Sequence, residues 1–459
     1  MFSLPGIAGL VVLIILRPFE FIEGLRGVPF LYIFFALAVF GFIIDLRLGH
    51  TELRTGPQWS WMLAFVGWCL VTTAIATPSQ LGSSAAGLSV LVLLFTATSF
   101  GVQSFRALEF VAALVLACAL IVATVCTHQS MQPFTCVAVG AGEEASSRGI
   151  SDGRPCTEPG QCLPESPDPE LLYRCEKNGV FGLTSIAGGR VRYAGVLQDP
   201  NEVAMVLSMA VPLAFAFRER RRTKFRWMVL VATVLLVGFC TLETKSRGGQ
   251  LVFLTVLGFY FVKRRGWAGV AIGAACIAPV LAFGGRAGRE ADESAVERLQ
   301  CWWEGMYMFR THPLFGVGFD RFGDYHYLTA HNSFVLALAE LGFPGMMLWT
   351  GLLYISIKMP WVALRAFNAV PEAQPARTWG VALVASFAGL LAGVFFLSFN
   401  YHYVLWIWLG LAGAFYGAVT SHSPAFRVRM GCKDLAFLAV GNACLVVVLF
   451  VYTRWKTGG

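Results

Sequence analysis

Residues 201–242 read NEVAMVLSMAVPLAFAFRERRRTKFRWMVLVATVLLVGFCTL, two apolar blocks on either side of a short, strongly basic segment. Each block, 201–217 and 226–242, is long enough to cross the hydrocarbon core of a bilayer as a helix. The segment 218–226 between them contains six basic residues. Because positively charged short loops stay on the cytoplasmic side, this turn predicts a helical hairpin that enters and leaves the membrane from the cytoplasm.

The pattern of apolar blocks extends through the whole chain. Of the 459 residues, 56% are apolar and only 14% are charged, whereas soluble proteins carry about 25% charged residues. The blocks that are candidate spans are 4–16, 28–44, 60–76, 84–101, 107–126, 201–217, 226–242, 248–262, 267–284, 333–357, 379–399, 402–419 and 435–453. The first is short enough to be re-entrant, and no cleavage site follows it. We therefore predict an all-α polytopic membrane protein with 12–13 transmembrane helices.

The net charge of +8 raises the question of a nucleic-acid partner. The basic residues argue against one, since most of those in short loops fall on a single side of the membrane when the N-terminus is cytoplasmic. Such a bias determines the orientation of a membrane protein. The positive charge is therefore explained by membrane topology, and we expect a lipid bilayer rather than nucleic acid around the chain.

This topology divides the chain into five segments. Transmembrane helices at 1–126, 201–284 and 333–459 are separated by two long extracytoplasmic loops, 127–200 and 285–332. The first loop is rich in Pro, Gly, Ser and acidic residues and shows little periodicity, so we expect an irregular cap.

Four cysteines lie in the first loop: Cys136, Cys156, Cys162 and Cys175. An even number of cysteines outside the cytoplasm predicts two disulfides, with three possible pairings. Free thiols are the alternative. The loop has no Cys-x-x-Cys motif, which disfavours a metal site.

The second loop contains a stretch, 296–309, whose apolar residues recur at helical spacing. Its aromatic residues suit a membrane interface, so we predict a helix lying on the outer surface. The Gly316-Val317-Gly318 motif that follows is not expected to bind a nucleotide, because no strand precedes it. Glu340, just inside a predicted span, is either a functional intramembrane carboxylate or a group brought near the surface by the Pro-Gly turn after it.

Basic side chains recur in the predicted outer turns. Lys245 and Arg247 precede a helix N-terminus, and this arrangement suits phosphate, although contact with lipid headgroups would also explain it. Arg192 requires an anionic partner so near the membrane, whereas Asp199 after it fits a helix N-cap. Arg298 on the predicted surface helix has the same two explanations as Arg247.

One histidine completes this set. His331, beside Asn332 at a membrane boundary, is either a neutral general base or a structural residue. Several arginines with one histidine, and no metal-ligand spacing, suit the binding of a pyrophosphate and the activation of a hydroxyl group. They do not suit metal-assisted hydrolysis.

The chain resembles the family of O-antigen ligases and polymerases over roughly residues 190–350. The motifs that carry the resemblance are Arg192-Tyr193-Ala194-Gly195 to Asp199-Pro200-Asn201-Glu202, Thr244-Lys245-Ser246-Arg247-Gly248-Gly249, His312-Pro313-Leu314-Phe315-Gly316-Val317-Gly318, Ala330-His331-Asn332-Ser333 and Ala339-Glu340-Leu341-Gly342-Phe343-Pro344-Gly345. In addition, Arg17-Pro18 is similar to exopolysaccharide polymerases of that group.

The resemblance implies a bacterial inner-membrane enzyme with a fold like the C-type glycosyltransferases. It would use an undecaprenyl-pyrophosphate-linked glycan as donor, without metal or cofactor. The family's essential arginines correspond to Arg247 and Arg298, its essential histidine corresponds to His331, and Arg192 matches a recurrent arginine. We expect Lys245, Asn332 and Arg192 to bind the pyrophosphate or the glycan.

The acceptor separates the two activities of the family. A polymerase transfers to another lipid-linked glycan, and a ligase transfers to lipid A-core or protein; polysaccharide-assembly proteins are expected partners of either. We predict a polymerase because of Arg17-Pro18, with a ligase as the alternative. A transporter of polysaccharide or lipid-linked glycan, or a scaffold, would be another class, but no internal repeat is visible and the candidate charges lie in outer turns.

Overall fold

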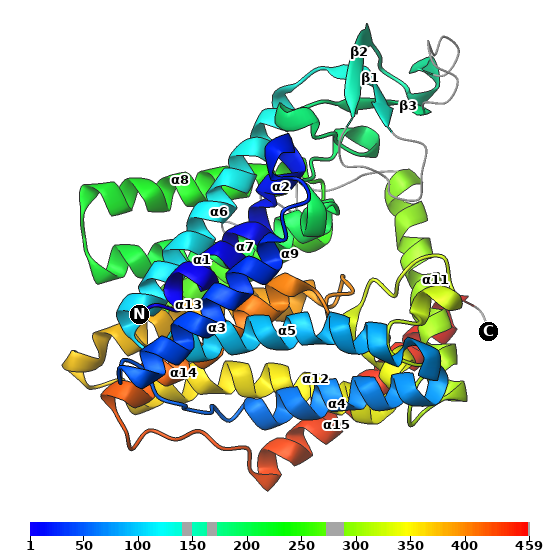
Figure 1. Cartoon of the computed structure of the whole chain (residues 1–459). Helices are drawn as coiled ribbons and strands as arrows, with labels where there is room; N and C mark the ends of the chain where they lie inside the picture. Colours follow the sequence, from blue (N-terminus) through cyan, green and yellow to red (C-terminus); the bar gives the residue numbers. More distant parts are fainter. Residues whose placement is uncertain (140–148, 163–171, 272–288, 458–459) are drawn as a thin grey trace.

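The computed structural model describes residues 1–139, 149–162, 172–271 and 289–457 (Figure 1). It is an all-α polytopic membrane protein, as predicted, with one small sheet. In the described part, 10 helices are long and apolar enough to cross a membrane. They are α3 (Phe30–Arg47), α4 (Trp59–Ala76), α5 (Leu81–Gly101), α6 (Phe105–Met131), α7 (Pro200–Arg220), α8 (Lys224–Glu243), α12 (Ser333–Ala366), α13 (Gln374–Gly393), α14 (Tyr403–His422) and α15 (Cys432–Thr457).

Further α-helices of the described part include α1 (Leu4–Leu16), α2 (Pro18–Phe21), α9 (Arg247–Arg265) and α11 (Arg289–Thr311). The predicted span count of 12–13 included the first of these, which has only 13 residues. It also included α9, which packs against α7 and α13 but carries basic residues in its first and last turns. The predicted span 267–284 lies outside the described residues from 272 onward.

Burial separates central helices from peripheral ones. In α14, 94% of the apolar window is buried, compared with 22% in α8 and 17% in α15. Helices that are apolar yet exposed face lipid, whereas a helix buried all round belongs to the centre of a bundle. The bundle therefore has α14, α7, α12 and α13 inside and presents α3, α8 and α15 to the bilayer.

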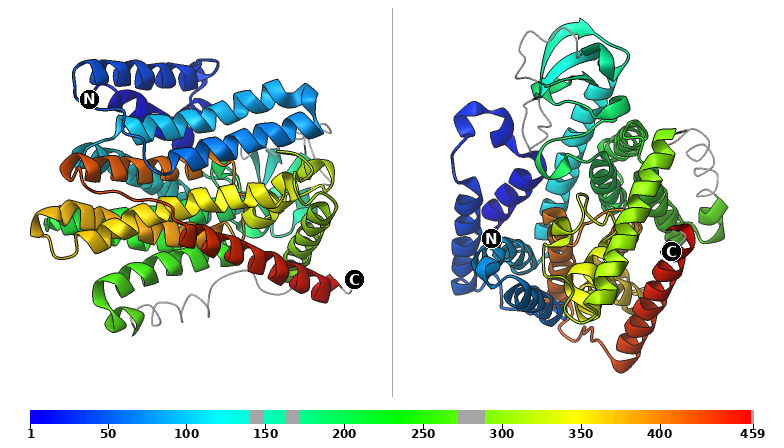
Figure 2. Two further views of the ribbon diagram at one scale, coloured as in Figure 1. Left: turned by 90° about the horizontal axis from the view of Figure 1, so that it is seen from below. Right: turned by 90° about the vertical axis from the view of Figure 1, so that its right-hand side faces the viewer.

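The bundle has two distinct ends (Figures 1 and 2). We call the end that carries the small sheet and α11 the sheet face, and the end with the turn between α7 and α8 the basic face. The right-hand view of Figure 2 looks onto the sheet face and shows α11 crossing the ends of other helices. The predicted surface helix 296–309 lies within α11, which packs on α12 and α15.

The first long loop contains an antiparallel sheet of β1 (Phe134–Val139), β2 (Ile150–Pro155) and β3 (Leu172–Lys177), in the order β2-β1-β3. The prediction of an irregular cap is therefore wrong for the described part of the loop. Its strands are short, and β2 is mostly exposed, so they lack the apolar alternation that marks a strand in sequence.

Disulfides cross-link this sheet. Cys136 bonds to Cys162 and Cys156 bonds to Cys175, which confirms two disulfides and selects one of the three pairings. Three of these sulfur atoms lie within 4.8 Å of one another, but all three take part in disulfides. Covalent links replace the hydrophobic core that so small a sheet cannot build.

Replacing both Cys156 and Cys175 by serine should open the sheet and leave the helices intact. The bond closes a separation of 19 residues, and its loss is expected to cost about 3 kcal/mol of local stability. Limited proteolysis of membranes would then cleave within 127–200 faster than in the wild type. The exposed free thiol Cys432 offers a matched control: Cys432→Ser should leave the cleavage rate unchanged, and equal rates in all three proteins would contradict the prediction.

Candidate functional site

The turn between α8 and α9 is held in place by local hydrogen bonds. Ser246 caps α9, and its hydroxyl accepts a hydrogen bond from the N–H of Gly249 (2.9 Å). Lys245 has a positive φ of 50°, which is uncommon for a residue other than glycine. Its Nζ donates to the carbonyl of Gly188 (2.7 Å). The turn is therefore attached to the loop that precedes α7, and Arg247 emerges from a fixed first turn of α9.

Close packing of α9 on α7 brings a second chain segment to this turn. A Cβ at Gly249 would lie 2.2 Å from the Cβ of Ala204, so only glycine permits this approach. The hydroxyl of Ser246 donates to the side-chain oxygen of Asn201 (2.5 Å), and the amide of Asn201 donates to Asp199 (2.7 Å). The interpretation of Asp199 as an N-cap is confirmed, since it accepts from the backbone N–H of Asn201.

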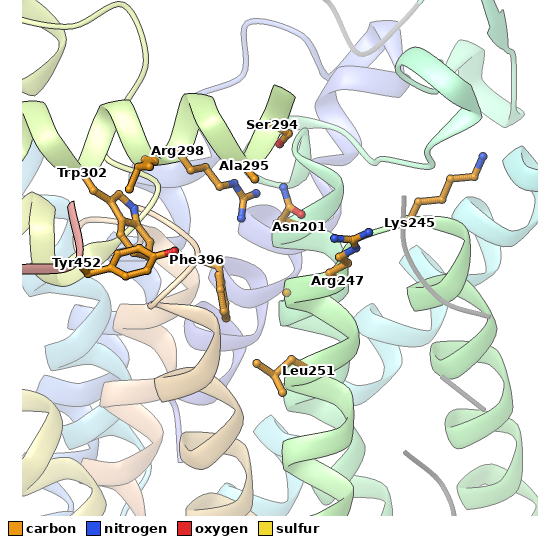
Figure 3. A pocket seen from close by; sticks show the side chains of 12 residues that line it. Asn201, Lys245, Arg247, Leu251, Ser294, Ala295, Arg298, Trp302, Phe396 and Tyr452 are labelled. Carbon is orange, nitrogen blue, oxygen red and sulfur yellow. The ribbon is translucent and has the colours of Figure 1, made fainter. Parts of the chain in front are cut away.

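A cavity of about 430 Å³ opens between α9, α7 and α11 on the sheet face. Arg247 and Arg298 enter it from two sides, with Asn201 between them (Figure 3). Lys245 lies at the edge, and its side chain points away from the two arginines in Figure 3. Two guanidinium groups that converge on one cavity form a site suited to an anion with several oxygens, such as a phosphate.

The rest of the cavity wall is largely apolar. It is formed by Leu251, Leu299, Trp302, Phe396 and Tyr452, of which Leu251 lies one turn below Arg247 (Figure 3). Leu251 is 45% exposed in the bundle, on a helix of spanning length. The cavity therefore has a cationic end and an apolar end, and it would suit a ligand with an anionic part and an apolar part.

His331 lies beside this cavity, immediately before α12. Its φ is 48°, a left-handed conformation that costs energy and is frequent at functional sites. Burial lowers the pKa of His331, and the positive charge of Arg298 lowers it further, while Asp199 acts in the opposite direction. The imidazole is therefore neutral at physiological pH, and it lies close enough to Arg298 to interact with it electrostatically. It does not itself line the cavity.

The backbone around His331 is fixed from two directions. Asn332 is fully buried and caps α12, accepting hydrogen bonds from the N–H groups of Phe334 (2.9 Å) and Val335 (3.1 Å). Ser333 donates through its hydroxyl to the carbonyl of Leu397 (2.7 Å). Asn332, predicted to bind substrate, is thus placed as a capping residue whose buried Nδ2 has no partner among the described residues.

Helix α12 is interrupted at Gly342, just before the Pro344-Gly345 motif. Gly342 has a φ of 67°, and Pro344 has no N–H to offer the carbonyl of Glu340 four residues earlier. That carbonyl accepts instead from the N–H of Gly318 (3.0 Å). A Cβ at Gly316 would lie 2.2 Å from the backbone of Glu340. Gly316, the first glycine of the Gly-x-Gly motif, is therefore required for close contact between the loop and α12.

The side chain of Glu340 ties the same loop to the next connection. It is 2% exposed and accepts hydrogen bonds from the N–H of Phe322 (3.1 Å) and the hydroxyl of Tyr401 (3.0 Å). Both donors lie outside α12, one before it and one after α13. Glu340 thus holds together two of the segments that position His331.

Replacing Glu340 by alanine should prevent correct assembly of this end of the bundle. Two buried donors would lose their acceptor, at about 1–3 kcal/mol each, whereas glutamine keeps one acceptor oxygen. We expect Glu340→Ala to reach the membrane at a reduced level with its 312–332 loop open to protease, and Glu340→Gln to stay close to the wild type. Protease sensitivity measured in membranes checks this, and an alanine variant as resistant as the wild type would refute it.

Arg192 lies apart from the cavity. Its guanidinium donates to the carbonyl and hydroxyl oxygens of Thr184 (both 2.9 Å), and it is 5% exposed. Burial lowers the pKa of Arg192, and the charge of Glu176 opposes this. The anionic partner that the sequence analysis required is therefore within the loop itself, and the geometry supports a role in holding the loop rather than in binding substrate.

The structure brings together three of the predicted residues and adds others. Arg247 of α9 and Arg298 of α11 line one cavity, and His331, just before α12, is close enough to Arg298 for that charge to lower its pKa. From the sequence, Asn201 was named only within the Asp199-Pro200-Asn201-Glu202 motif, and neither Phe396 nor Tyr452 was predicted to belong to the site. No local signal identifies the last two, since each is one of many aromatic residues in spans.

Comparison with known proteins agrees with the motifs. Residues 232–350, less than half of the chain, match a family described as O-antigen ligase. This confirms the resemblance noted in the sequence, and the matched segment includes Arg247, Arg298 and His331. It excludes Arg192. No curated protein matches the chain.

Proposed function

We propose, from the O-antigen ligase segment at residues 232–350 as premise, that this chain is a glycosyltransferase that moves an undecaprenyl-pyrophosphate-linked glycan on the extracytoplasmic side of the bacterial inner membrane. The observation that carries the proposal is the cavity in which Arg247 and Arg298 meet above an apolar wall. A prenyl pyrophosphate has the same two parts, a multiply charged head and an apolar chain.

The arginines would stabilise the leaving group. As the bond between the sugar C1 and the pyrophosphate oxygen breaks, negative charge builds on that oxygen. Guanidinium groups already placed in a cavity with an apolar wall stabilise such charge without reorganisation. Because Arg247 and Arg298 come from different helices, they can contact different oxygens of one pyrophosphate.

His331 would serve the acceptor. The attacking hydroxyl group must lose its proton as its oxygen bonds to the sugar C1, and a neutral imidazole can accept that proton. Burial and Arg298 keep His331 in this neutral form. The proton then resides on His331, the glycosidic bond is formed, and undecaprenyl pyrophosphate is the other product. No step requires a metal ion or cofactor.

Two acceptors fit this chemistry. We favour a second lipid-linked glycan, which makes the chain a polymerase, because Arg17-Pro18 is similar to exopolysaccharide polymerases. Arg17 lies in a separate cavity of about 200 Å³ with Phe19, Tyr32 and Tyr403. The family description favours the alternative, a ligase that transfers to lipid A-core or protein.

Glycan profiles separate these possibilities. The wild type is expressed in a cell that lacks the native protein, and surface polysaccharide and lipid-linked glycans are compared with those of the empty cell. Without a polymerase, long polymer disappears and single lipid-linked repeats accumulate. Without a ligase, full-length polymer stays on its lipid carrier. Unchanged glycan pools would refute the proposal, and glycan accumulation in vesicles would indicate a transporter.

A further inference from the structure

The turn between α7 and α8 contains a second cavity, on the basic face and far from the candidate site. Its volume is about 360 Å³, and it is lined by Arg218, Arg222, Thr223, Lys224, Trp227 and Met228. In the sequence, this basic run indicates only the orientation of the chain in the membrane. Its three-dimensional arrangement indicates a more specific role.

Two basic residues of this run, Arg220 and Arg226, make contacts within the bundle. Arg220 forms an ion pair with Glu109 (2.7 Å) and donates to Gln374 (2.7 Å), and Arg226 donates to the carbonyl of Phe217 (2.8 Å). These two residues are occupied by protein partners, and neither lines the cavity. Their charges are explained by contacts within the bundle.

The cavity-lining cations differ. For Arg218, Arg222 and Lys224, the described part of the chain offers no ion pair and no side-chain hydrogen bond. Glu219 interacts electrostatically with Arg222, but its carboxylate oxygens already accept hydrogen bonds from Tyr260 and Arg264. The cavity thus collects positive charge that the described residues do not neutralise.

Arg218 makes this excess of positive charge energetically unfavourable. Its Nη1 atom is buried and has no hydrogen-bond partner among the described residues. A buried donor on a charged group is stabilised strongly by an acceptor and is unfavourable without one. An anion in the adjoining cavity would supply the missing negative charge.

Apolar side chains border the same cations. Phe225, Trp227 and Met228 are 69%, 54% and 60% exposed, and they begin a peripheral helix of which only 22% of the apolar window is buried. Tryptophan is enriched where hydrocarbon meets headgroups. A ligand here would contact cations with one part and apolar side chains with the other.

We propose that the cavity formed by residues 218–228 binds the phosphate headgroup of an anionic phospholipid, with its acyl chains along the start of α8. Arg218, Arg222 and Lys224 surround the phosphate, and Trp227 and Met228 contact the glycerol and the first methylene groups. A free phosphate ion carries the same kind of charge but has no apolar part to contact Trp227 and Met228. The inference does not depend on the proposed enzymatic function.

Native mass spectrometry of the purified full chain tests the inference with phosphatidylglycerol and phosphatidylcholine as probes. The wild type should retain phosphatidylglycerol preferentially. Each basic residue near a lipid headgroup contributes about fivefold in affinity, so the double variant Arg218→Gln and Arg222→Gln should bind about 25-fold more weakly. The control Arg265→Gln removes an exposed charge from the last turn of α9, at the same end of the bundle, and should bind as the wild type does.

Three results would overturn the inference. They are equal retention of the two lipids by the wild type, undiminished phosphatidylglycerol binding by the double variant, and complete displacement of phosphatidylglycerol by excess inorganic phosphate. The last would show a free-anion site. Size-exclusion profiles confirm that each variant is folded, and the single variant Lys224→Gln, at the exposed rim, replaces the double variant if that protein aggregates.

Discussion

Replacing His331 by alanine is expected to lower the rate of glycan transfer by about 100- to 10,000-fold, the contribution of a well-placed general base. The residue lies on a strained backbone beside the cavity, and burial and Arg298 keep it neutral. Transfer should be measured in proteoliposomes with a lipid-linked donor. The variant should reach the membrane at the wild-type level, because the side chain of His331 caps no helix.

A pH profile distinguishes a base from a structural histidine. A base works in its neutral form, and the lowered pKa of His331 keeps that form populated below the ordinary histidine pKa of about 6.5. Wild-type activity should therefore stay level down to that pH and fall only in more acid buffer. In Arg298→Gln, whose residual rate is low, the fall should move to higher pH because one cause of the lowered pKa is gone.

His326 is a suitable control for this experiment. It lies in the same loop, stacked on Tyr327 (4.6 Å between ring centroids). It takes no part in the proposed proton transfer, and it is the smallest of the causes that lower the pKa of His331. His326→Ala should retain most of the activity. Full activity in His331→Ala, or a wild-type profile that falls above the ordinary histidine pKa, would exclude His331 as the base.

Replacing Arg247 by glutamine is expected to lower the turnover number by about 100-fold, because one preorganised donor to the leaving group is lost. Lysine should restore little of this, since an ammonium group keeps the charge but not the planar fork that grips two oxygens. The donor's KM should change less than the turnover number if the contact strengthens as charge develops. Initial rates over a range of donor concentrations separate the two quantities.

Arg310 provides the matched control for this second prediction. It lies exposed in the last turn of α11, the helix that carries Arg298, and does not line the cavity. Arg310→Gln removes the same charge from the same face and should stay near wild-type activity. An equal loss in both variants would mean that the general surface charge, and not the cavity, controls the rate.

The class of protein and several candidate residues could be predicted from the sequence because each depends on local pattern. Long apolar blocks such as α6 and α15 indicate membrane helices from composition alone, and the aromatic spacing of 296–309 indicates the surface helix within α11. Arg247 and His331 were identified because they are polar residues near the ends of apolar segments, in motifs similar to the O-antigen ligase family. Arg298 was identified because it lies on the predicted surface helix and corresponds to an essential arginine of that family.

Other features were not accessible in this way. The small sheet was missed because disulfides replace the apolar alternation that would reveal its strands. Arg192 was expected to meet substrate, yet the charge that favours its ionised form is that of Glu176, in β3 of the same loop. Sequence shows that a cation requires a partner but does not show which partner the fold supplies.

The sequence alone is sufficient to predict a polytopic helical membrane protein with a basic turn at 218–226, and it indicates the residue types of the candidate site. Those properties follow from hydropathy and charge over short windows. The three-dimensional arrangement was needed to show which cysteines pair, that Arg247 and Arg298 share one cavity, and that the break in α12 anchors the loop before His331. These depend on packing between distant segments, such as the close approach of Gly249 to Ala204, which no local pattern encodes.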